Sequence, residues 1–499
     1  MKLSFFSKHI NKIIFTFTAL LSLVSFIYFY KIGLTNAYAD GAVHLNIARR
    51  VVDNLKPGLG NLVGSWLPLL HILMLPTIWN NFMWQSGIAG SIVNMVAFVF
   101  SAFYLYKLIY EITNNKLSAF LGWVIFSLNI NILYFQTTSM TETLFISTLI
   151  FGIYNLYKWQ KYQSNNSLVL SALFFSLSSL VRYEGWLLVL FAIIAVILAS
   201  LKLYGRKKAE GEFFIFTAVA TSGILLWLLL QKLILGSPFA FLTNEHAAGK
   251  ELNLSTLQTY KNITSSLLVY FYSLNYMNGI ILSLIFLASL LVFLINKNKK
   301  ILSPGNLILF LLFVPFIFDL ISLYFGKITM QVPKINNTFF NVRYALYLLP
   351  AIAVFVSIAF NKKYIQISLF FVLLISAFSI TPFFTNNFIF LNDAQASIYK
   401  QGEFETYFKN SYTGGLILIS SASSDYLIQK LNLPLKNYVQ ESSEELWGKA
   451  LYIPGDFVEY VILTNTPKDF VASNINRYWL NHDFELIKKV DGLEVYKKL

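Results

Sequence analysis

The sequence predicts a polytopic α-helical membrane protein with a small C-terminal α/β domain outside the bilayer. Of its 499 residues, 56% are hydrophobic and only 12% are charged, about half the charged share of a typical soluble domain. Long apolar runs recur through residues 1–384, whereas residues 385–499 have the mixed polarity of a soluble domain. This composition excludes an ordinary cytoplasmic enzyme and a disordered chain.

The charges are distributed unevenly along the chain. Residues 1–384 contain 27 Lys and Arg against 10 Asp and Glu, and residues 385–499 contain 11 against 14. A basic excess beside apolar runs is typical of membrane topology signals, so we expect no nucleic-acid partner. The chain has no Cys, which excludes disulfide bonds and thiolate chemistry.

Transmembrane helices are predicted from run length, because a span needs roughly 20 mostly apolar residues. About eleven segments meet this requirement: 12–30, 86–108, 118–136, 142–158, 167–182, 185–202, 212–235, 268–295, 303–325, 344–361 and 364–383. Residues 66–83 are apolar but interrupted by Pro68 and Pro76. We expect them to form an interfacial or re-entrant helix.

Lysines and arginines fix the predicted orientation. If the N-terminus is cytoplasmic, every short inner segment carries at least two of them, as the positive-inside rule requires. The outer segments are then residues 31–85, 137–141, 183–184, 236–267 and 326–343, with the C-terminal domain. Ala37-Tyr38-Ala39 is similar to a signal-peptidase site, but the preceding apolar run is long for a signal peptide. We therefore expect an uncleaved first helix and a multi-pass protein of the plasma membrane.

The C-terminal domain, residues 386–499, has strand and helix signals in alternation. Short β-branched runs at 415–419 and 458–463 predict strands. Asp491-Gly492 between two further runs predicts a hairpin. Amphipathic helices are expected near 393–409, 422–431 and 469–480. Nothing in this domain is typical of a cofactor loop or a catalytic set.

Ionisable residues of the apolar region collect on its predicted outer side. Such groups are costly near a membrane and are candidates for function. The outer acids are Asp40, Asp53, Glu142, Glu184, Glu245 and Glu251, with Asp319 in the outer half of a span. The outer cations and histidines are Arg182, Lys250, Lys327, Lys334, Arg343, His44 and His246. A charged outer rim over an apolar bundle is therefore the main functional indication.

Asp40 and His44 open the first outer loop, four residues apart. On a helix they share one face, which suits a carboxylate oriented by an imidazole or two ligands of one metal. The alternative is that Asp40 caps a helix over residues 41–54. Spacing alone leaves both interpretations open.

Glu142 and the Arg182–Glu184 turn lie at outer helix ends. A first-turn acid complements the helix dipole, so Glu142 has a structural as well as a functional interpretation. Arg182 could pair with Glu184 or contact an anion.

Arg343 precedes a helix, where its charge opposes the dipole. We expect a phosphate or a carboxylate to compensate it. His246 lies in a polar outer loop and is expected to be solvated, whereas His71 and Asp319 are expected to be buried and paired.

This set of residues suits the transfer of a group from a phosphate leaving group to a hydroxyl at a membrane surface. A hydroxyl acceptor needs a base, and an anionic phosphate leaving group needs cations. An apolar bundle can receive a lipid tail, so a lipid-linked phosphate donor would arrive from the bilayer. No glycine-rich phosphate loop supports a nucleotide donor.

The order of these motifs resembles the GT-C glycosyltransferases. Asp40 in the first loop, Glu142, the Arg182-Tyr183-Glu184-Gly185-Trp186 turn and Arg343-Tyr344 before Pro350 carry the resemblance. Among these enzymes, the chain looks similar to the protein O-mannosyltransferases of glycosyltransferase family 39 and to the lipid A aminoarabinose transferases. The likeness covers roughly residues 12–383, within a predicted transmembrane domain of residues 1–385.

The resemblance implies inverting transfer of a hexosyl or pentosyl group from a polyprenyl-phosphate donor to a protein, lipid or glycan hydroxyl. It implies that Asp40 is the base or a carboxylate that orients the acceptor, and that Glu142 positions the acceptor or a metal. Arg182, Arg343 and Tyr344 would hold the donor phosphate, with His44, His246 and Glu184 as accessory residues. Family members commonly have a second acid after the first-loop Asp, whereas this chain has Asp40-Gly41-Ala42. A divalent metal therefore stays open, with no ligand set assigned.

Two other classes remain as alternatives. A secondary transporter would place its ionisable residues near the midplane and would commonly show inverted repeats. A non-catalytic subunit of polysaccharide or glycan assembly would keep the fold without the chemistry, and the altered first-loop motif is its best support.

Overall fold

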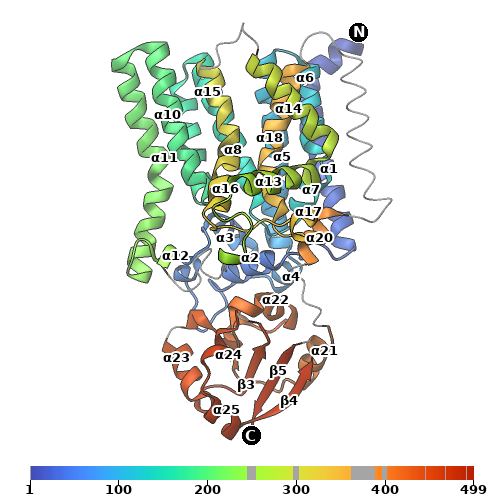
Figure 1. The fold of residues 1–499 in the computed structure, drawn as a ribbon, viewed down its shortest axis with the longest axis vertical. Coiled ribbons are helices and arrows are strands. Elements are labelled where there is room, and N and C mark those ends of the chain that lie inside the picture. The colour runs from blue at the N-terminus through green and yellow to red at the C-terminus, as the bar shows by residue number, and fades with distance from the viewer. Residues whose placement is uncertain are drawn as a thin grey trace.

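The structure, a computed structural model, consists of a helical bundle and a small α/β domain (Figure 1). It describes residues 2–243, 254–295, 303–360, 388–395, 402–443, 445–466, 468–490 and 492–499. The N-terminus lies at the end of the bundle far from the C-terminal domain. Helices α2, α3 and α4 lie between the bundle and that domain.

Long apolar helices build the bundle. They are α1 (Lys2–Lys31), α5 (Ile88–Thr113), α6 (Lys116–Ser127), α7 (Ile130–Phe135), α8 (Glu142–Tyr162), α9 (Asn165–Ser179), α10 (Glu184–Tyr204), α11 (Arg206–Leu235), α13 (Ile263–Asn278), α14 (Ile280–Ile295), α15 (Pro304–Phe310), α16 (Val314–Tyr324) and α18 (Leu349–Ala359). Among the described residues, six helical stretches are long and apolar enough to cross a membrane, or seven if a bent pair is one span. The chain is therefore a multi-span membrane protein, while the count of eleven spans is not confirmed.

Two predicted spans are interrupted by local backbone signals, so their prediction as continuous helices is wrong. Residues 118–136 divide into α6 and α7, because the Asn129 side chain accepts hydrogen bonds from Asn131 N and Ile132 N and starts a new helix. Residues 268–295 divide into α13 and α14, which meet at 116°. Gly279 makes this bend with φ of 82°. The predicted span at 364–383 lies outside the described residues.

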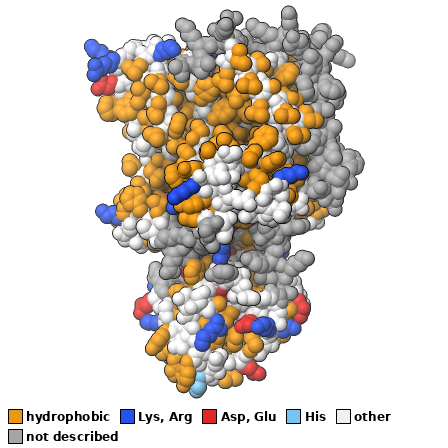
Figure 2. Space-filling view, in the orientation of Figure 1, with side chains coloured by type: hydrophobic (Ala, Val, Ile, Leu, Met, Phe, Trp, Pro, Cys, Tyr) orange, Lys and Arg blue, Asp and Glu red, His pale blue; other side chains and the backbone are white. Residues whose placement is uncertain are grey.

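The sides of the bundle, where helices such as α11 face away from it, are apolar. Figure 2 shows hydrophobic side chains over most of one face, in contrast to the mixed surface of the C-terminal domain. On α11, for example, Leu225 and Leu233 are 61% and 70% exposed. Exposed leucines in this density are expected where the solvent is lipid.

Short helices form the end of the bundle next to the C-terminal domain. They are α2 (Ala39–Arg49), η1 (Leu59–Leu62), α3 (Leu69–Ile78), α4 (Asn81–Gln85), α12 (Ala240–Thr243), α17 (Pro333–Asn336) and η4 (Val342–Leu348). Helix α3 has only ten residues, too few to cross a bilayer. Its position at the bundle end agrees with the predicted interfacial helix.

The C-terminal domain contains a mixed five-stranded sheet in the order β2-β1-β3-β5-β4. Its strands are β1 (Ile417–Leu418), β2 (Tyr438–Val439), β3 (Tyr460–Thr464), β4 (Phe484–Val490) and β5 (Leu493–Lys498). Strands β1, β2 and β3 are parallel, and β3, β5 and β4 pair antiparallel. Helix α20 (Ile389–Gln395) precedes the sheet. The other helices of the domain are α21 (Gly402–Ser411), α22 (Ser421–Leu431), α23 (Glu445–Tyr452), α24 (Phe470–Asn474) and α25 (Arg477–Asp483). The predicted strands and hairpin are confirmed, whereas the two-residue β2 and helix α23 were not predicted.

Candidate functional site

Arg343 joins two acids that lie far apart in the sequence. Its Nη2 donates to Asp40 Oδ2 at 2.6 Å, and its Nε donates to Glu142 Oε1 at 2.9 Å. The Arg343 and Glu142 side chains are buried, whereas that of Asp40 is 35% exposed. The three residues come from η4, α8 and α2. The structure therefore brings α2, the start of α8 and η4 together at one charged centre.

Asp40 does not cap its helix. The N-cap of α2 is Tyr38 and makes no side-chain cap bond. Asp40 is the second residue of α2, and its carboxylate contacts Arg343 instead. The capping interpretation is therefore wrong, because an ion pair with a buried guanidinium takes the carboxylate.

Arg182 lies beside the same acids. Its Nη2 is 2.7 Å and its Nε 2.9 Å from Glu184 Oε1, and its Nη1 donates to Thr141 Oγ1 at 2.9 Å. The same Nη1 is 3.8 Å from Glu142 Oε1. Glu184 thus pairs with Arg182, as one of the two interpretations predicts, and Glu142 lies between two guanidinium groups.

Tyrosine rings line the two arginines. The Tyr344 ring lies 5.0 Å from Arg182 Cζ and 5.3 Å from Arg343 Cζ. Tyr347 lies 5.2 Å from Arg182, and Tyr38 lies 5.1 Å from Arg343. Aromatic faces at these distances stabilise guanidinium groups and hold them in a plane.

Polar loop residues fix Glu142 at the start of α8. Asn94 Nδ2 donates to the carbonyls of Thr138 and Met140 at 2.8 and 2.7 Å, and Ser91 Oγ donates to Thr137 O at 2.7 Å. These bonds hold the loop before α8 against α5. Sequence spacing could not reveal this support, since the partners are more than 40 residues apart.

Two histidines lie next to this centre. His44 Nδ1 is 2.9 Å from His71 Nε2, and both rings are buried. Burial, with the nearby Arg182 and Arg343 charges, lowers the pKa of His44 to about 3. The same burial, with His44 nearby, lowers the pKa of His71 well below its usual range. Both rings are therefore neutral at physiological pH, and the expected pairing of His71 is confirmed.

Several residues of this site were not predicted. Asp393 of α20 accepts a hydrogen bond from Tyr38 Oη at 2.9 Å and one from Val342 N at 3.4 Å. Thr141 and Tyr347 contact Arg182 directly. An aspartate outside the apolar region gave no signal in the sequence, because only the tertiary structure carries α20 back to η4.

Other predicted residues lie outside this centre or lack the expected partner. His246 lies outside the described residues. Asp319 is fully buried as expected, but neither of its carboxyl oxygens has a hydrogen-bond partner among the described residues. The prediction that Asp319 is paired is therefore wrong as regards hydrogen bonds.

The acids do not form a metal site in the described part of the chain. No group of three or more His, Asp or Glu side chains there has ligand geometry. Asp40 and Glu142 are instead bridged by a guanidinium, whose positive charge occupies the place of a cation.

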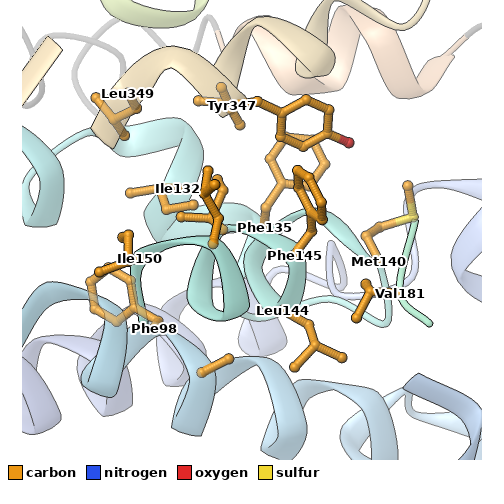
Figure 3. Close-up of a cluster of buried hydrophobic side chains, with 14 of the residues drawn as sticks. Phe98, Ile132, Phe135, Met140, Leu144, Phe145, Ile150, Val181, Tyr347 and Leu349 are labelled. Carbon is orange, nitrogen blue, oxygen red and sulfur yellow. The ribbon is translucent and has the colours of Figure 1, made fainter. Parts of the chain in front are cut away.

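Helices α8 and η4, which carry Glu142 and Arg343, also contribute to an apolar cluster. Figure 3 shows Phe145 beside Tyr347, with Leu144 on the other side of α8, and the rings of Phe145 and Tyr347 are 5.2 Å apart in an edge-on arrangement. Glu142 Oε2 and the Tyr347 hydroxyl are buried and have no hydrogen-bond partner among the described residues. A rigid apolar wall with unused polar atoms in front of it can orient a polar ligand.

Chemically, the centre offers two fixed guanidinium groups and one partly exposed carboxylate. Among the described residues, none accepts a hydrogen bond from Nη1 of Arg343. An anion can therefore approach Arg343 without displacing Glu142. A phosphate next to a carboxylate base is the arrangement that a transfer to a hydroxyl needs.

Among the comparisons with known proteins, the one with solved structures finds similar folds. No protein family profile matches the chain, and no curated protein matches it in sequence. ArnT from Cupriavidus metallidurans bound to undecaprenyl phosphate is similar with a TM-score of 0.62 and 8% identity, covering 96% of this chain and 98% of that one. The oligosaccharyltransferase AglB from Archaeoglobus fulgidus, in complex with an inhibitory peptide and a dolichol-phosphate, is similar with a TM-score of 0.52 and 13% identity.

The match to the archaeal enzyme is partial in length. It covers 92% of this chain and 69% of the AglB chain. In another structure of the Archaeoglobus fulgidus enzyme, with a TM-score of 0.48 and 15% identity, this chain covers 58% of its length and 85% of its own. The match to ArnT, in contrast, spans nearly both chains, including the C-terminal domain. The chain therefore has the fold of ArnT and AglB, which are themselves GT-C glycosyltransferases.

Proposed function

We propose that this protein transfers a sugar from a polyprenyl-phosphate donor to an acceptor hydroxyl at the outer face of the membrane. The observation that carries the proposal is the Arg343 bridge between Asp40 and Glu142, with Arg182 beside it. This bridge lies at the end of the bundle next to the C-terminal domain, in a chain with the ArnT fold. The acceptor is a hydroxyl of a protein, a lipid or a glycan.

Arg343, Arg182 and Tyr344 hold the donor phosphate in this proposal. Arginine forks match phosphate oxygens better than lysine does, and Tyr344 keeps both guanidinium groups in place. The apolar wall and the lipid-facing bundle suit the polyprenyl chain. The structures of ArnT and AglB contain undecaprenyl phosphate and dolichol-phosphate respectively, which supports a lipid-linked donor.

Asp40 acts as the general base. Its carboxylate is partly exposed, so an acceptor hydroxyl can reach it. Asp40 takes the hydroxyl proton while the hydroxyl oxygen attacks the anomeric carbon. The bond from that carbon to the phosphate oxygen breaks on the opposite side, with inversion. Arg343 and Arg182 stabilise the polyprenyl phosphate that leaves.

Glu142 and the accessory residues hold this arrangement. Glu142 fixes Arg343 through Oε1, and its buried Oε2, which has no hydrogen-bond partner in the described part of the chain, positions the acceptor. Glu184 orients Arg182 in the same way. His44 is neutral and serves as a hydrogen-bonding group, not as a base. We assign no step to a metal, because the bridged acids do not offer a ligand set.

The proposed orientation places the N-terminus in the cytoplasm and the C-terminal domain, residues 386–499, outside the plasma membrane. It follows from the lysine-rich inner segments. The N-terminus and the C-terminal domain lie at opposite ends of the bundle (Figure 1), as this orientation requires.

The test uses the purified full chain in nanodiscs with undecaprenyl-phosphate hexoses and pentoses labelled in the sugar. Membrane extract supplies acceptors, and label that leaves the donor lipid is measured. We expect transfer with at least one donor and a loss of about 10³-fold or more in Asp40→Asn, typical of removing a base. Glu445→Gln is the matched control, because Glu445 is an exposed acid of the C-terminal domain.

Other results would overturn the proposal. Transfer by Asp40→Asn at the wild-type rate would exclude Asp40 as the base. Binding of undecaprenyl phosphate without transfer from any donor would favour a non-catalytic subunit. Solute uptake by proteoliposomes without transfer would favour a transporter.

A further inference from the structure

Helix α2 connects the charged centre to the C-terminal domain. Its second residue, Asp40, contacts Arg343. Its last turn carries Asn46, and Arg50 follows directly after it. With a rise of about 1.5 Å per residue, Asn46 and Arg50 lie roughly 9 and 15 Å along the helix from Asp40. One short rigid helix therefore joins two sets of polar contacts.

Asp425 of α22 receives the far end of this helix. Asn46 Nδ2 donates to Asp425 O at 2.8 Å and to Asp425 Oδ1 at 2.9 Å. Arg50 Nη2 donates to Asp425 Oδ1 at 2.9 Å and to Gln440 Oε1 at 2.9 Å. All four side chains are buried. Buried contacts of this kind hold their partners firmly, because breaking one leaves an unpaired charge in the interior, which is costly.

A second set of bonds fixes α2 against α3 and α4. Arg49 donates to the carbonyls of Ile78 and Trp79 at 2.9 and 2.6 Å. Trp84 Nε1 donates to Asn46 Oδ1 at 3.0 Å, and Gln429 of α22 donates to Trp84 O at 3.0 Å. Asn46 is thus hydrogen-bonded to both Trp84 and Asp425, and the end of α2 is held on two sides.

We propose that Asp425 is a positioning residue for Asp40, acting through Asn46, Arg50 and helix α2. The C-terminal domain then completes the transfer site through Asp425, which acts through helix α2 and not on the reacting atoms. This inference rests on the proposed function. Because a base misplaced by about 1 Å can lose on the order of 100-fold in rate, loosening this contact would lower the rate without removing any catalytic group.

Asp425→Ala removes the contact, and we expect the transfer rate constant to fall about 10- to 100-fold. The affinity for undecaprenyl phosphate should stay within twofold, because Arg182 and Arg343 are untouched. Asp425→Glu keeps the charge and should recover part of the rate. Lys430→Ala is the matched control, because Lys430 is exposed on the same helix.

A double-variant cycle separates positioning from folding. If Asp425 acts through Asp40, Asp425→Ala causes no further fall in an Asp40→Asn background. An equal fall in both backgrounds would overturn the inference.

A second measurement does not depend on transfer. The chain has no Cys, so Asp40→Cys introduces a single thiol whose maleimide labelling reports on α2. We expect Asp425→Ala to raise this labelling rate several-fold and to leave that of Glu445→Cys unchanged. An unchanged rate at position 40 would overturn the positioning role even if no donor sugar is found. The proposed function alone would be overturned if the wild-type protein transfers no sugar while Asp425→Ala still raises the labelling rate of Asp40→Cys.

Discussion

At the scale of single residues, Arg343 is the centre of the site. It is buried, and its two ion pairs reach residues 201 and 303 positions away in the sequence. A buried guanidinium needs such partners, since desolvation of an unpaired charge costs several kcal/mol. The planar fork explains why arginine and not lysine occupies this position.

The variant Arg343→Lys tests whether the site needs a guanidinium group and not only a positive charge. A lysine ammonium cannot bond both acids and a phosphate with the same geometry. We expect a loss of about 2–5 kcal/mol in undecaprenyl phosphate binding, the usual cost of breaking a buried charged contact. Titration of the purified variant with undecaprenyl phosphate measures it. Arg206→Lys, on an exposed arginine of α11, is the control, and equal affinity in both variants would contradict the assignment of Arg343.

The His44–His71 pair predicts a dependence of stability on pH. The pKa of both rings is lowered in the folded protein, so only the unfolded chain gains these protons as pH falls through about 6.5. Folding stability should therefore decrease on acidification, by roughly 1.4 kcal/mol per pH unit per histidine well below that pH. Thermal unfolding in detergent between pH 7.5 and 5.5 measures the effect.

The control for this prediction is a pair of variants. His44→Gln/His71→Gln should weaken the pH dependence, whereas His482→Gln should keep it, because His482 is an exposed residue. A double variant with the wild-type slope would show that other groups cause the acid sensitivity.

At the scale of elements, the close contact of α5 with the loop before α8 positions Glu142. Gly90 lies so near this loop that an added Cβ would be 2.6 Å from Ser139 Cα. A backbone atom cannot move aside as a flexible side chain can. The absence of a side chain at position 90 therefore allows the hydrogen bonds from Asn94 and Ser91 to form.

Gly90→Ala should push this loop away from α5. We expect a loss of about 1–3 kcal/mol in stability, the usual cost of overpacking, together with a lower transfer rate because Glu142 moves. The thermal unfolding midpoint and the transfer assay measure both effects. Gly448→Ala is the matched control, since nothing lies within 4 Å of its added Cβ. A Gly90→Ala protein as stable and active as the wild type would show that the loop adapts freely.

At the scale of the whole molecule, the charge distribution sets the predicted orientation. The apolar helices of the bundle end in lysine-rich segments, and the charged centre lies at the other end near the C-terminal domain. A sugar-transfer site at that end meets donors that have already crossed the membrane.

Single cysteines test this orientation directly. Glu445→Cys in the C-terminal domain should react with a membrane-impermeant maleimide in intact cells, and Lys207→Cys at the start of α11 should not. Both positions are exposed, so only their side of the membrane distinguishes them. Permeabilised cells should label both variants. The reverse pattern in intact cells would place the site in the cytoplasm and contradict the proposed function.

Much of this fold could be predicted from the sequence alone. Composition and run length indicated a membrane bundle and a C-terminal α/β domain, because partitioning into lipid depends on local hydrophobicity. The predicted spans put Asp40, Glu142, Arg182 and Arg343 on the same predicted side of the membrane, and this indicated a candidate site. The breaks at Asn129 and Gly279 were missed, since a single capping or left-handed residue hardly changes the hydropathy of a 20-residue window.

The tertiary structure alone decided which of these residues meet. The pairing of Arg343 with both Asp40 and Glu142, the recruitment of Asp393, and the contact of Asp425 with α2 join segments separated by 51 to 379 residues. Local pattern fixes how each segment partitions and coils. Which buried charge finds which partner depends on how the helices pack, and no window along the chain contains that information.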